Sequence, residues 1–206
     1  SIARYTSEDE YAGLPEKELL ATEFPDLELN HPWGISVDNA IALAIECEDA
    51  ARTYDAEISN SEGASVNTHQ GIHVMGNSLG FLHGYISTRH SLSCSVLAQR
   101  GDSMQRDYWY SVSRNPLNIE QPIEIGKKAA ERALRRLQGR SLSTRQCPVL
   151  YSAEIASSLL ASFIGAISGG NLYRKSSFLL DALDSQIFPE FIHIHEQPHL
   201  KSALGS

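Results

Sequence analysis

The chain has 206 residues, of which 42% are hydrophobic and 20% charged, and its formal net charge is -8 from 17 basic and 25 acidic residues. These proportions are typical of a globular protein that can bury its own core, and the negative charge argues against nucleic acid as a main partner, because that binding draws on clustered Lys and Arg. No apolar run approaches the roughly 20 residues of a membrane span, so we expect no membrane partner.

Cysteine usage points to a reducing compartment. Cys47, Cys94 and Cys147 lie far apart and no C-x-x-C pair occurs, so neither a zinc knuckle nor a redox motif is indicated. Such free thiols are typical of cytoplasmic proteins, and no basic-then-apolar signal peptide opens the chain. We therefore expect a cytoplasmic protein. Because the first residue is Ser1 rather than Met, we also expect an internal segment of a longer protein.

Residues 1–35 predict an irregular connector, because three prolines are spaced through them. Within this connector Ser7 and Glu10 stand at the spacing of a capping box, which predicts a short helical turn. We expect the connector to wrap around a core formed by the elements that follow.

Residues 37–53 predict a helix, because apolar side chains fall roughly on one stripe. Either Ser36 or Asp38 is suited to cap it. Between residues 64 and 114 the hydrophobic period changes to two, and glycine-containing turn signals separate the runs. This pattern predicts an antiparallel meander of three to five strands with one face packed on helices.

Residues 122–138 form the clearest predicted helix, because its apolar residues recur every three or four positions and Pro122 suits its first turn. Residues 148–151 read as a buried strand. Ser152 then caps a predicted helix that runs to about Ser168 and is apolar on most sides, so we expect this helix to be buried.

Gly169 and Gly170 end that helix, and the tail from 178 to 199 predicts a short helix and a strand. The fold class is therefore α+β, an antiparallel β-meander packed with helices. The predicted parts are an irregular connector at 1–35, a helix, sheet and helix at 36–150, and the start of a C-terminal domain at 151–206.

The stretch from Gly76 to Gly80 matches the nucleophile-elbow pattern G-x-S-x-G, in which Ser78 would attack a carbonyl carbon. That chemistry needs a strand, a sharp turn and then a helix, whereas residues 81–85 look like a strand. A hairpin turn explains both glycines and Asn77 without catalysis. We expect a hairpin, and catalytic residues stay unknown.

Histidines offer a second candidate chemistry. His193 and His195 would share one face of a strand, with Glu196 and His199 nearby. Zinc needs three or four converging ligands, and alternation of these histidines with isoleucines is also what a half-buried edge strand shows. We expect no metal site in this chain. Four further histidines are expected on the surface of the meander or in a groove: His69, His73, His83 and His90.

Two polar stretches of the meander are candidate binding residues. Arg89 and His90 lie between Ser and Thr residues near a strand junction, and Tyr108 belongs to an aromatic run next to a predicted Arg106–Asp107 ion pair. One interpretation is a core strand with a hydrogen-bonded tyrosine. The other is a groove that holds an extended peptide, because Tyr and Trp supply a large contact area.

The most concentrated polar segment follows two glycines near the C-terminus. It contains Asn171, Arg174, Lys175 and Ser176. Its cations and hydroxyls could hold a carboxylate or phosphate group of a substrate or partner. A solvated loop is the alternative, and spacing alone does not decide between the two.

Four motifs, taken together and in this order, closely resemble the PmbA (TldE) branch of the TldD/PmbA family of bacterial peptide-processing proteins. They are Gly76–Phe81, Ser87–Ser91, Met104–Tyr110 and Gly169–Ser177. The resemblance covers essentially the whole chain, while members of the family are longer. It therefore agrees with an internal segment.

The resemblance implies a function shared between two subunits. A TldD-type partner and a chain of this branch are regarded together as a cytoplasmic metalloprotease that trims peptides and degrades an unfolded protein. The expected partners are a TldD-type subunit and a peptide or unfolded-protein substrate, and a homo-oligomer is compatible with the isolated chain. The alternatives are a self-sufficient peptidase and a regulatory or scaffold binding protein, to which the family's older label of gyrase modulator belongs.

In TldD the metal helix carries H-E-x-x-x-H, with two histidine ligands and a glutamate that activates water. Laid on this chain, Ala161 and Ala166 take the histidine positions and Ser162 takes the glutamate position. Alanine offers no atom that binds a cation. The resemblance thus implies a non-catalytic subunit, with no cofactor in this chain and zinc only in the TldD partner.

Overall fold

The computed structural model describes residues 2–5, 7, 9 and 12–205. It contains two compact units, which are Ser1–Gly139 together with Gln197–Ser206, and Arg140–Glu196. The predicted turn of Ser7 and Glu10 lies partly outside the described residues.

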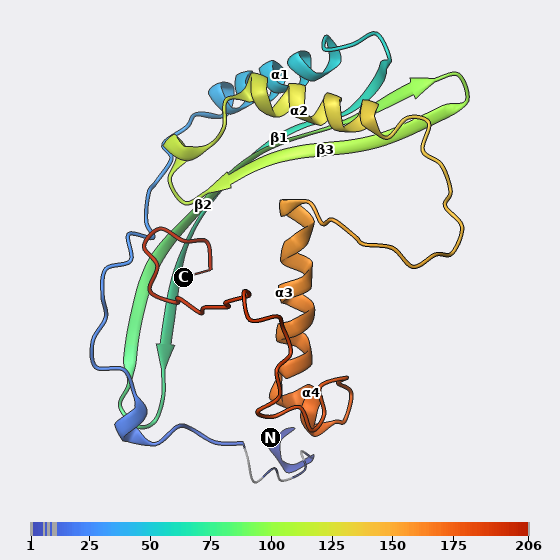
Figure 1. The fold of residues 1–206 in the computed structure, drawn as a ribbon. Helices are drawn as coiled ribbons and strands as arrows, with labels where there is room; N and C mark the ends of the chain where they lie inside the picture. The colour runs from blue at the N-terminus through green and yellow to red at the C-terminus, as the bar shows by residue number, and fades with distance from the viewer. Residues whose placement is uncertain (1, 6, 8, 10–11, 206) are drawn as a thin grey trace. The chain divides into compact units, whose positions relative to one another are not determined.

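A three-stranded antiparallel sheet is the centre of the first unit (Figure 1). Its strands are β1 (Ile58–Gly76), β2 (Leu82–Arg100) and β3 (Ser103–Ser113), in the order β1-β2-β3. The predicted α+β fold with an antiparallel meander is confirmed. β3 pairs with β2 only from His90 onward, so the hairpin of β1 and β2 continues past the end of β3 as a two-stranded arm.

A tight hairpin joins β1 to β2 at residues 77–81. Asn77 N–H donates to Phe81 O at 2.9 Å, and Asn77 Oδ1 accepts from two further backbone N–H groups of the loop. Gly80 has a φ of 92°, which glycine adopts far more readily than other residues. Ser78 therefore lies between two strands. The hairpin prediction is confirmed, and the helix that a serine nucleophile needs does not follow this turn.

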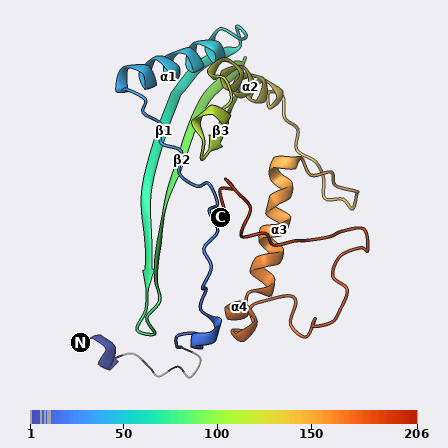
Figure 2. The same cartoon turned by 90° about the vertical axis from the view of Figure 1, so that its left-hand side faces the viewer.

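Two helices cover one face of the sheet, α1 (Val37–Arg52) and α2 (Pro122–Arg135) (Figures 1 and 2). Both predicted helices are confirmed. Ser36 caps α1, because its Oγ accepts a hydrogen bond from Asn39 N–H at 3.2 Å. The side chain of Asp38 instead lies in the first turn.

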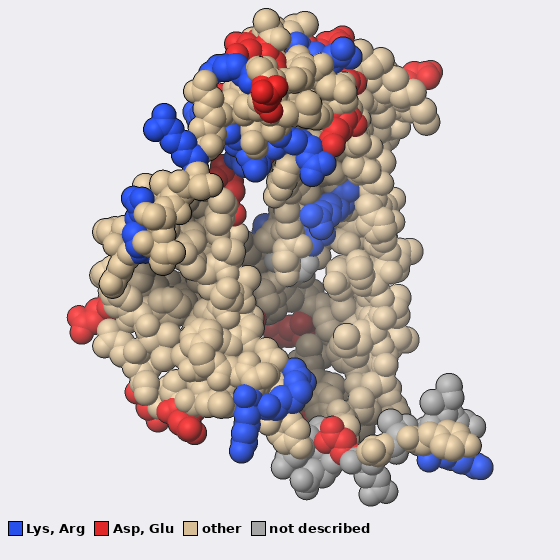
Figure 3. All heavy atoms as spheres, turned by 90° about the vertical axis from the view of Figure 1, so that its right-hand side faces the viewer, with Lys and Arg blue, Asp and Glu red and all other residues tan. Residues whose placement is uncertain are grey.

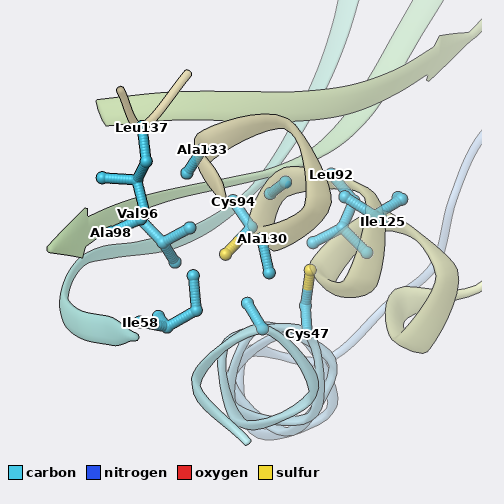
Figure 4. Packing of buried hydrophobic residues seen from close by; sticks show 12 residues of the cluster. Cys47, Ile58, Leu92, Cys94, Val96, Ala98, Ile125, Ala130, Ala133 and Leu137 are labelled. Atoms are coloured by element: carbon cyan, nitrogen blue, oxygen red, sulfur yellow. The ribbon is translucent and has the colours of Figure 1, made fainter. Parts of the chain in front are cut away.

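The core lies between this face of the sheet and the two helices (Figure 4). Side chains two apart along a strand point to the same face, so alternate residues of β2 enter it. The core residues are Cys47 and Ala51 of α1, Ile58 of β1, Leu92, Cys94, Val96 and Ala98 of β2, and Ile125, Ala129, Ala130, Ala133 and Leu137 of α2 and the turn after it. Many of these are alanines, which lets the helices approach closely.

Two of the core side chains are thiols. Cys47 and Cys94 are free and buried next to each other. Hydrogen bonding to Cys94 and burial raise the pKa of the Cys47 thiol. Cys47 is therefore protonated at neutral pH and behaves as a small apolar side chain.

Gly126 of α2 lies directly against the backbone of α1. A Cβ atom at this position would lie 2.1 Å from Cys47 O and 3.0 Å from Ala51 N. Both are backbone atoms of α1, so neither can yield without moving the helix. The packing of α1 on α2 therefore requires glycine here.

Arg106 and Asp107 do not form the predicted ion pair with each other. Adjacent residues of a strand point to opposite faces, and each side chain has other partners. Arg106 Nη1 lies 2.9 Å from Glu62 Oε1 of β1. Asp107 is buried under α2, 3.3 Å from Arg132 Nε and 3.4 Å from Arg136 Nη1. The prediction was wrong because it considered sequence neighbours rather than faces.

Buried polar side chains attach the connector and the C-terminal tail to the sheet. Thr88 N–H donates to Leu29 O at 2.9 Å, and Thr88 Oγ1 accepts from His31 N–H at 2.8 Å. Thr88 Oγ1 also donates to Arg114 O at 2.9 Å, and Arg114 Nε donates to Ala203 O at 2.7 Å. These bonds satisfy backbone groups of two segments that have no ladder of their own.

The second unit contains α3 (Ala153–Ile167) and the short α4 (Gly169–Tyr173). The predicted helix after Ser152 is confirmed, but its predicted burial is wrong, since Ala166 is its one buried residue. Within this unit α3 meets α4 and loop residues such as Phe188. These cannot cover a helix that is apolar on most sides.

Two predicted strands of this region are also wrong. Residues 148–151 and the stretch around Ile192 and Ile194 are irregular and exposed. The predicted short helix after Phe178 is a series of turns, and Gly169 begins α4 directly after α3. Short apolar runs have no neighbouring strand to pair with in the described part of this unit. None of the helices described is long and apolar enough to cross a bilayer.

We expect Gly126→Ala to lower the free energy of unfolding by about 2 kcal/mol or more, because its new methyl group overlaps the backbone of α1. Chemical denaturation of the protein measures this loss. Gly165→Ala in α3 is the matched control. Its Cβ would meet nothing within 4 Å, so the higher helix propensity of alanine should leave stability unchanged or up to about 1 kcal/mol higher. Equal effects of the two substitutions would contradict the close approach.

We expect Asp107 to contribute stability that depends on pH. Burial acts to raise the pKa of its carboxyl group, but the Tyr108 N–H and the guanidinium groups of Arg132 and Arg136 outweigh it, so the pKa lies below its ordinary value. The unfolded pKa is about 3.9. The contribution is therefore complete above roughly pH 4 and is lost as the pH falls through the lower folded pKa.

Denaturation of Asp107→Asn and the unaltered protein across pH checks this contribution. At pH 7 the substitution should cost about 2 kcal/mol, because it weakens hydrogen bonds to a buried charge, and the difference should shrink below about pH 4. Glu131→Gln is the control, because its pair with Arg135 is exposed and such pairs contribute little. A difference between Asp107→Asn and the unaltered protein that is constant from pH 7 to pH 3 would contradict the ionised pair.

Candidate functional site

The two ligand positions and the glutamate position that the resemblance places on this chain lie in the second half of α3. Ala161 and Ala166 carry methyl groups, and Ala166 is buried. Ser162 Oγ donates to Ser158 O of the preceding turn at 2.9 Å. None of these side chains supplies the imidazole, thiolate or carboxylate that zinc requires. The residues at these three positions therefore do not fit a zinc ion.

The remaining candidate ligands do not converge either. Across residues 2–5, 7, 9 and 12–205, no three His, Cys, Asp or Glu side chains form a group that could hold a metal ion. His193 and His195 are exposed on irregular chain. His199 belongs to the other compact unit, with the tail from Gln197.

The polar segment after α3 is first of all a helix terminus. Gly165 O and Ala166 O are among the last carbonyl groups of α3, which have no partner within the helix. Asn171 Nδ2 donates to Gly165 O at 2.7 Å, and Ser177 Oγ donates to Ala166 O at 2.7 Å. The two side chains thus fold the α4 segment back onto the end of α3.

Arg174 and Lys175 lie on the surface at the end of α4. Arg174 Nη2 donates to Asn171 Oδ1 at 2.8 Å, and Ser176 N–H donates to Asn171 O at 2.9 Å. An internal ion pair of Arg174 with an acid such as Asp181 or Asp184 is the alternative to an outside contact. Among the described residues Arg174 makes no ion pair with either of them or with another carboxylate. Two uncompensated cations on an ordered turn can therefore receive an anionic group of another molecule.

The candidates on the meander divide between the two faces of the sheet. Arg89 and Tyr108 point to the outer face, which is the face turned away from α1 and α2. There Tyr108 stacks on Tyr110 with ring centroids 6.2 Å apart, opposite a row of serines on β2. Tyr108 pairs with Ser95, six residues from Arg89, so the two candidates lie about 20 Å apart. They do not form one compact site.

His90 lies on the opposite, helix-covered face and is 1% exposed. Its Nδ1 is 2.8 Å from Thr68 Oγ1 and its Nε2 is 2.9 Å from His31 O. Trp33 packs edge-on against the imidazole ring, with the two ring centroids 5.5 Å apart. Both ring nitrogens are therefore used within the chain, and His90 positions the connector.

Sequence reasoning missed a groove of about 740 Å³ between the connector and the β1–β2 arm. Its walls include Glu23, Asp26 and Leu27 of the connector and Tyr85 and Ile86 of β2. The connector has no hydrophobic period that would place it against a strand. The prolines of the connector, which favour extended chain, were the one available signal.

Charge on the surface is mixed. On the face drawn in Figure 3, basic and acidic side chains of the described residues are interspersed rather than gathered into one basic patch. Much of the remaining surface there is uncharged. On this face, acidic side chains therefore interrupt the basic ones.

Two family models match the chain. The model of the PmbA/TldA metallopeptidase central domain matches residues 30–137, and the model of the PmbA/TldA metallopeptidase C-terminal domain matches residues 144–206.

Curated relatives match over the whole length of the chain. Metalloprotease PmbA of Escherichia coli O157:H7 is 49% identical over 205 residues, and a PmbA homologue of Haemophilus influenzae is 47% identical over 206 residues. Each match covers 100% of this chain and 46% of the relative. The chain therefore spans about half the length of the curated relatives it matches.

Solved structures share the fold. A candidate modulator of DNA gyrase from Bacteroides thetaiotaomicron has a TM-score of 0.87 and 28% identity over 97% of this chain and 46% of its own. TldE from Thermococcus kodakarensis has a TM-score of 0.59 over 87% of this chain and 40% of its own, and at 19% identity the likeness is one of fold alone. From the two family models and from relatives that are nearly half identical, the chain belongs to the PmbA/TldA metallopeptidase family.

Proposed function

We propose that this chain is the non-catalytic subunit of a two-subunit cytoplasmic metallopeptidase. A TldD-type partner supplies the zinc and the residues that activate water, while this chain helps to bind the peptide and stabilises the partner. Family membership supports a role in peptide hydrolysis. The observation that carries the non-catalytic role is the donor set of α3, where Ala161, Ser162 and Ala166 offer no zinc ligand.

The surfaces of the chain suit such a division of labour. The α4 segment presents Arg174 and Lys175 to the outside on a turn that Asn171 and Ser176 hold in place. A guanidinium group is suited to grip a carboxylate in bidentate fashion. We assign this segment to contact with the TldD-type subunit or with an acidic group of the peptide.

We expect the purified protein to contain only substoichiometric zinc, and its complex with a TldD-type subunit to contain one zinc ion that this chain does not supply ligands for. Chelation should abolish peptide cleavage by the complex, because zinc activates the attacking water. It should leave the melting temperature of the isolated protein unchanged, because no structural metal contributes to its folding. Elemental analysis and thermal denaturation measure the two effects.

One tightly bound zinc per isolated chain, together with cleavage in the absence of a partner, would support the self-sufficient peptidase instead. A complex that forms but cleaves no peptide would support a regulatory or scaffold protein without a protease role.

We expect the double substitution Arg174→Ala and Lys175→Ala to weaken association with the TldD-type subunit, or the kcat/KM of the complex, by roughly tenfold, because it removes two charges from the contact. The free energy of unfolding should change by less than about 1 kcal/mol, since the bond from Arg174 to Asn171 is exposed. Binding titrations, cleavage assays and thermal denaturation separate these effects.

Arg145→Ala is the matched control, because Arg145 is also exposed and bonds only with nearby Ser143 among the described residues. This control should leave association and cleavage unchanged. A large loss of stability in the double variant, with normal association, would assign the two cations to folding of the second unit.

A further inference from the structure

The arm of the β1–β2 hairpin has an outer edge that β3 does not cover. The registers of β1 and β2 run without interruption from the pair Thr88–Gln70 to the pair Leu82–Gly76, whereas β3 begins to pair with β2 at His90. In the part of the chain that the structure describes, the edge of β2 from Leu82 to Ser87 therefore has no strand beside it on the β3 side.

The backbone groups that face this edge follow from the pairing pattern. In an antiparallel ladder, residues alternate between those that bond the neighbouring strand and those whose N–H and C=O point away from it. Thr88 N–H points away from β1, because it donates to Leu29 O at 2.9 Å. With the register unbroken, Ile86 and Gly84 point the same way. Neither makes a backbone hydrogen bond to the connector among the described residues.

The connector holds this edge open instead of covering it. At one end of the edge Leu29 bonds Thr88, and at the other end Phe24 stacks on His83 with ring centroids 3.6 Å apart. Between these two contacts lies the groove of about 740 Å³. Figures 1 and 2 both show the connector on the β2 side of the hairpin. The outward groups of Gly84 and Ile86 thus face a space large enough for another segment of chain.

The walls of the groove are apolar and acidic. Leu27, Leu29 and Ile86 supply apolar surface, and among the described residues no Lys or Arg lines the groove. Its carboxylates are those of Glu23, Asp26 and Glu28, of which Glu28 is paired with Lys201 outside the lining, and its remaining polar side chains include His31, His83 and His199. Glu23 makes no ion pair among the described residues. A basic side chain on an occupant would therefore meet opposite charge without displacing an internal partner.

From this geometry we propose that the groove binds an extended peptide that carries basic side chains, which adds as a strand to the outer edge of β2. An extended backbone is the ligand whose spacing matches the outward N–H and C=O groups of Ile86 and Gly84. Apolar side chains of the peptide pack on Ile86 and Leu27, and a cation lies near Glu23 and Asp26. The proposal rests on the proposed function in that it names the peptide class that this subunit holds.

Fluorescence anisotropy of the whole protein, without its partner, tests this binding. The probe is a fluorescein-labelled hexapeptide of alternating lysine and valine. Ile86→Pro should weaken binding by about tenfold or more, because it removes an N–H that faces the peptide. The fold should survive, since proline is tolerated where the N–H points away from the ladder. Ile86→Val, which keeps the N–H and a branched side chain, is the matched control and should bind nearly normally.

Changes in the peptide test the same contact without altering the protein. In strand addition, only every second residue of the added peptide forms backbone hydrogen bonds with β2. N-methylation of one alternate set should therefore abolish binding, and N-methylation of the other set should leave it largely intact. Equal effects of the two sets would overturn the proposal, as would the absence of binding by the unmodified peptide.

Charge is tested with Glu23→Gln and with a peptide that has glutamate in place of lysine. The substitution should lower the affinity for the lysine peptide roughly threefold, as expected for an exposed charge pair. This difference in affinity should become smaller at high salt. The glutamate peptide should bind at least threefold more weakly than the lysine peptide. Concentration-dependent self-association that Ile86→Pro abolishes, with no peptide binding, would mean that a second copy occupies the edge.

Cleavage by the complex with a TldD-type subunit distinguishes this inference from the proposed function. Normal cleavage without binding at this edge would overturn the inference alone. Binding at this edge in a complex that cleaves no peptide would overturn the proposed function alone.

Discussion

The hydrogen bonds of one buried threonine decide how the irregular parts of the first unit are arranged. Thr88 bonds the connector through Leu29 and His31, and bonds the end of β3 through Arg114 O. Arg114 in turn binds the tail through two carbonyl groups. Segments that are far apart in sequence and have no ladder of their own thus meet at one position on β2. Together with the bond from His90 to His31 O and the stacking of Phe24 on His83, this junction keeps the connector beside the arm, so that the groove has two walls.

The requirements of a peptidase can be divided into parts that do not depend on one another. A zinc site requires specific ligand atoms on one helix, and two alanines on α3 are enough to remove it. A strand edge and an acidic groove need only backbone geometry and a few carboxylates. On the function proposed above, a subunit keeps the means to hold an extended chain without the means to cut one. Family membership and the alanines at positions 161 and 166 are compatible for this reason.

The parts of the fold that depend on local period could be predicted from the sequence. Helices at 37–53 and 122–138 and the antiparallel meander were correct, because their periods of 3.6 and two extend over many residues. The strand at 148–151 was wrong, because a short apolar run does not distinguish a strand from exposed loop. The exposure of α3 was missed. Its apolar residues show that the helix is suited to packing against other elements, but they do not show whether its own unit contains such elements.

The candidate site depends even more on distant residues. His90 was expected at the surface or in a groove, yet its side chain is buried. Its hydrogen-bond partner, His31 O, lies 59 residues away in the sequence. Arg89 and Tyr108 lie on the same face of the sheet but far apart along it. Their separation follows from the register of β2 with β3, which no local sequence motif reveals. The groove arises from a connector without periodicity. Motifs that identify a family therefore did not identify which of their side chains are accessible.

The unequal lengths of the strands give β2 two different stabilities along one continuous element. From Leu92 to Ala98 it is a central strand under two helices, and its helix-facing residues Leu92, Cys94, Val96 and Ala98 are almost fully buried. In the arm, side chains such as Ile72 and Leu82 are 73% and 75% exposed, and an isolated two-stranded hairpin is only marginally stable. Amide hydrogens of the arm should therefore exchange with solvent through local opening. Those of the strand under the helices should exchange only through global unfolding. A strand that opens locally at one end can accommodate a neighbour there without disturbing the core at the other.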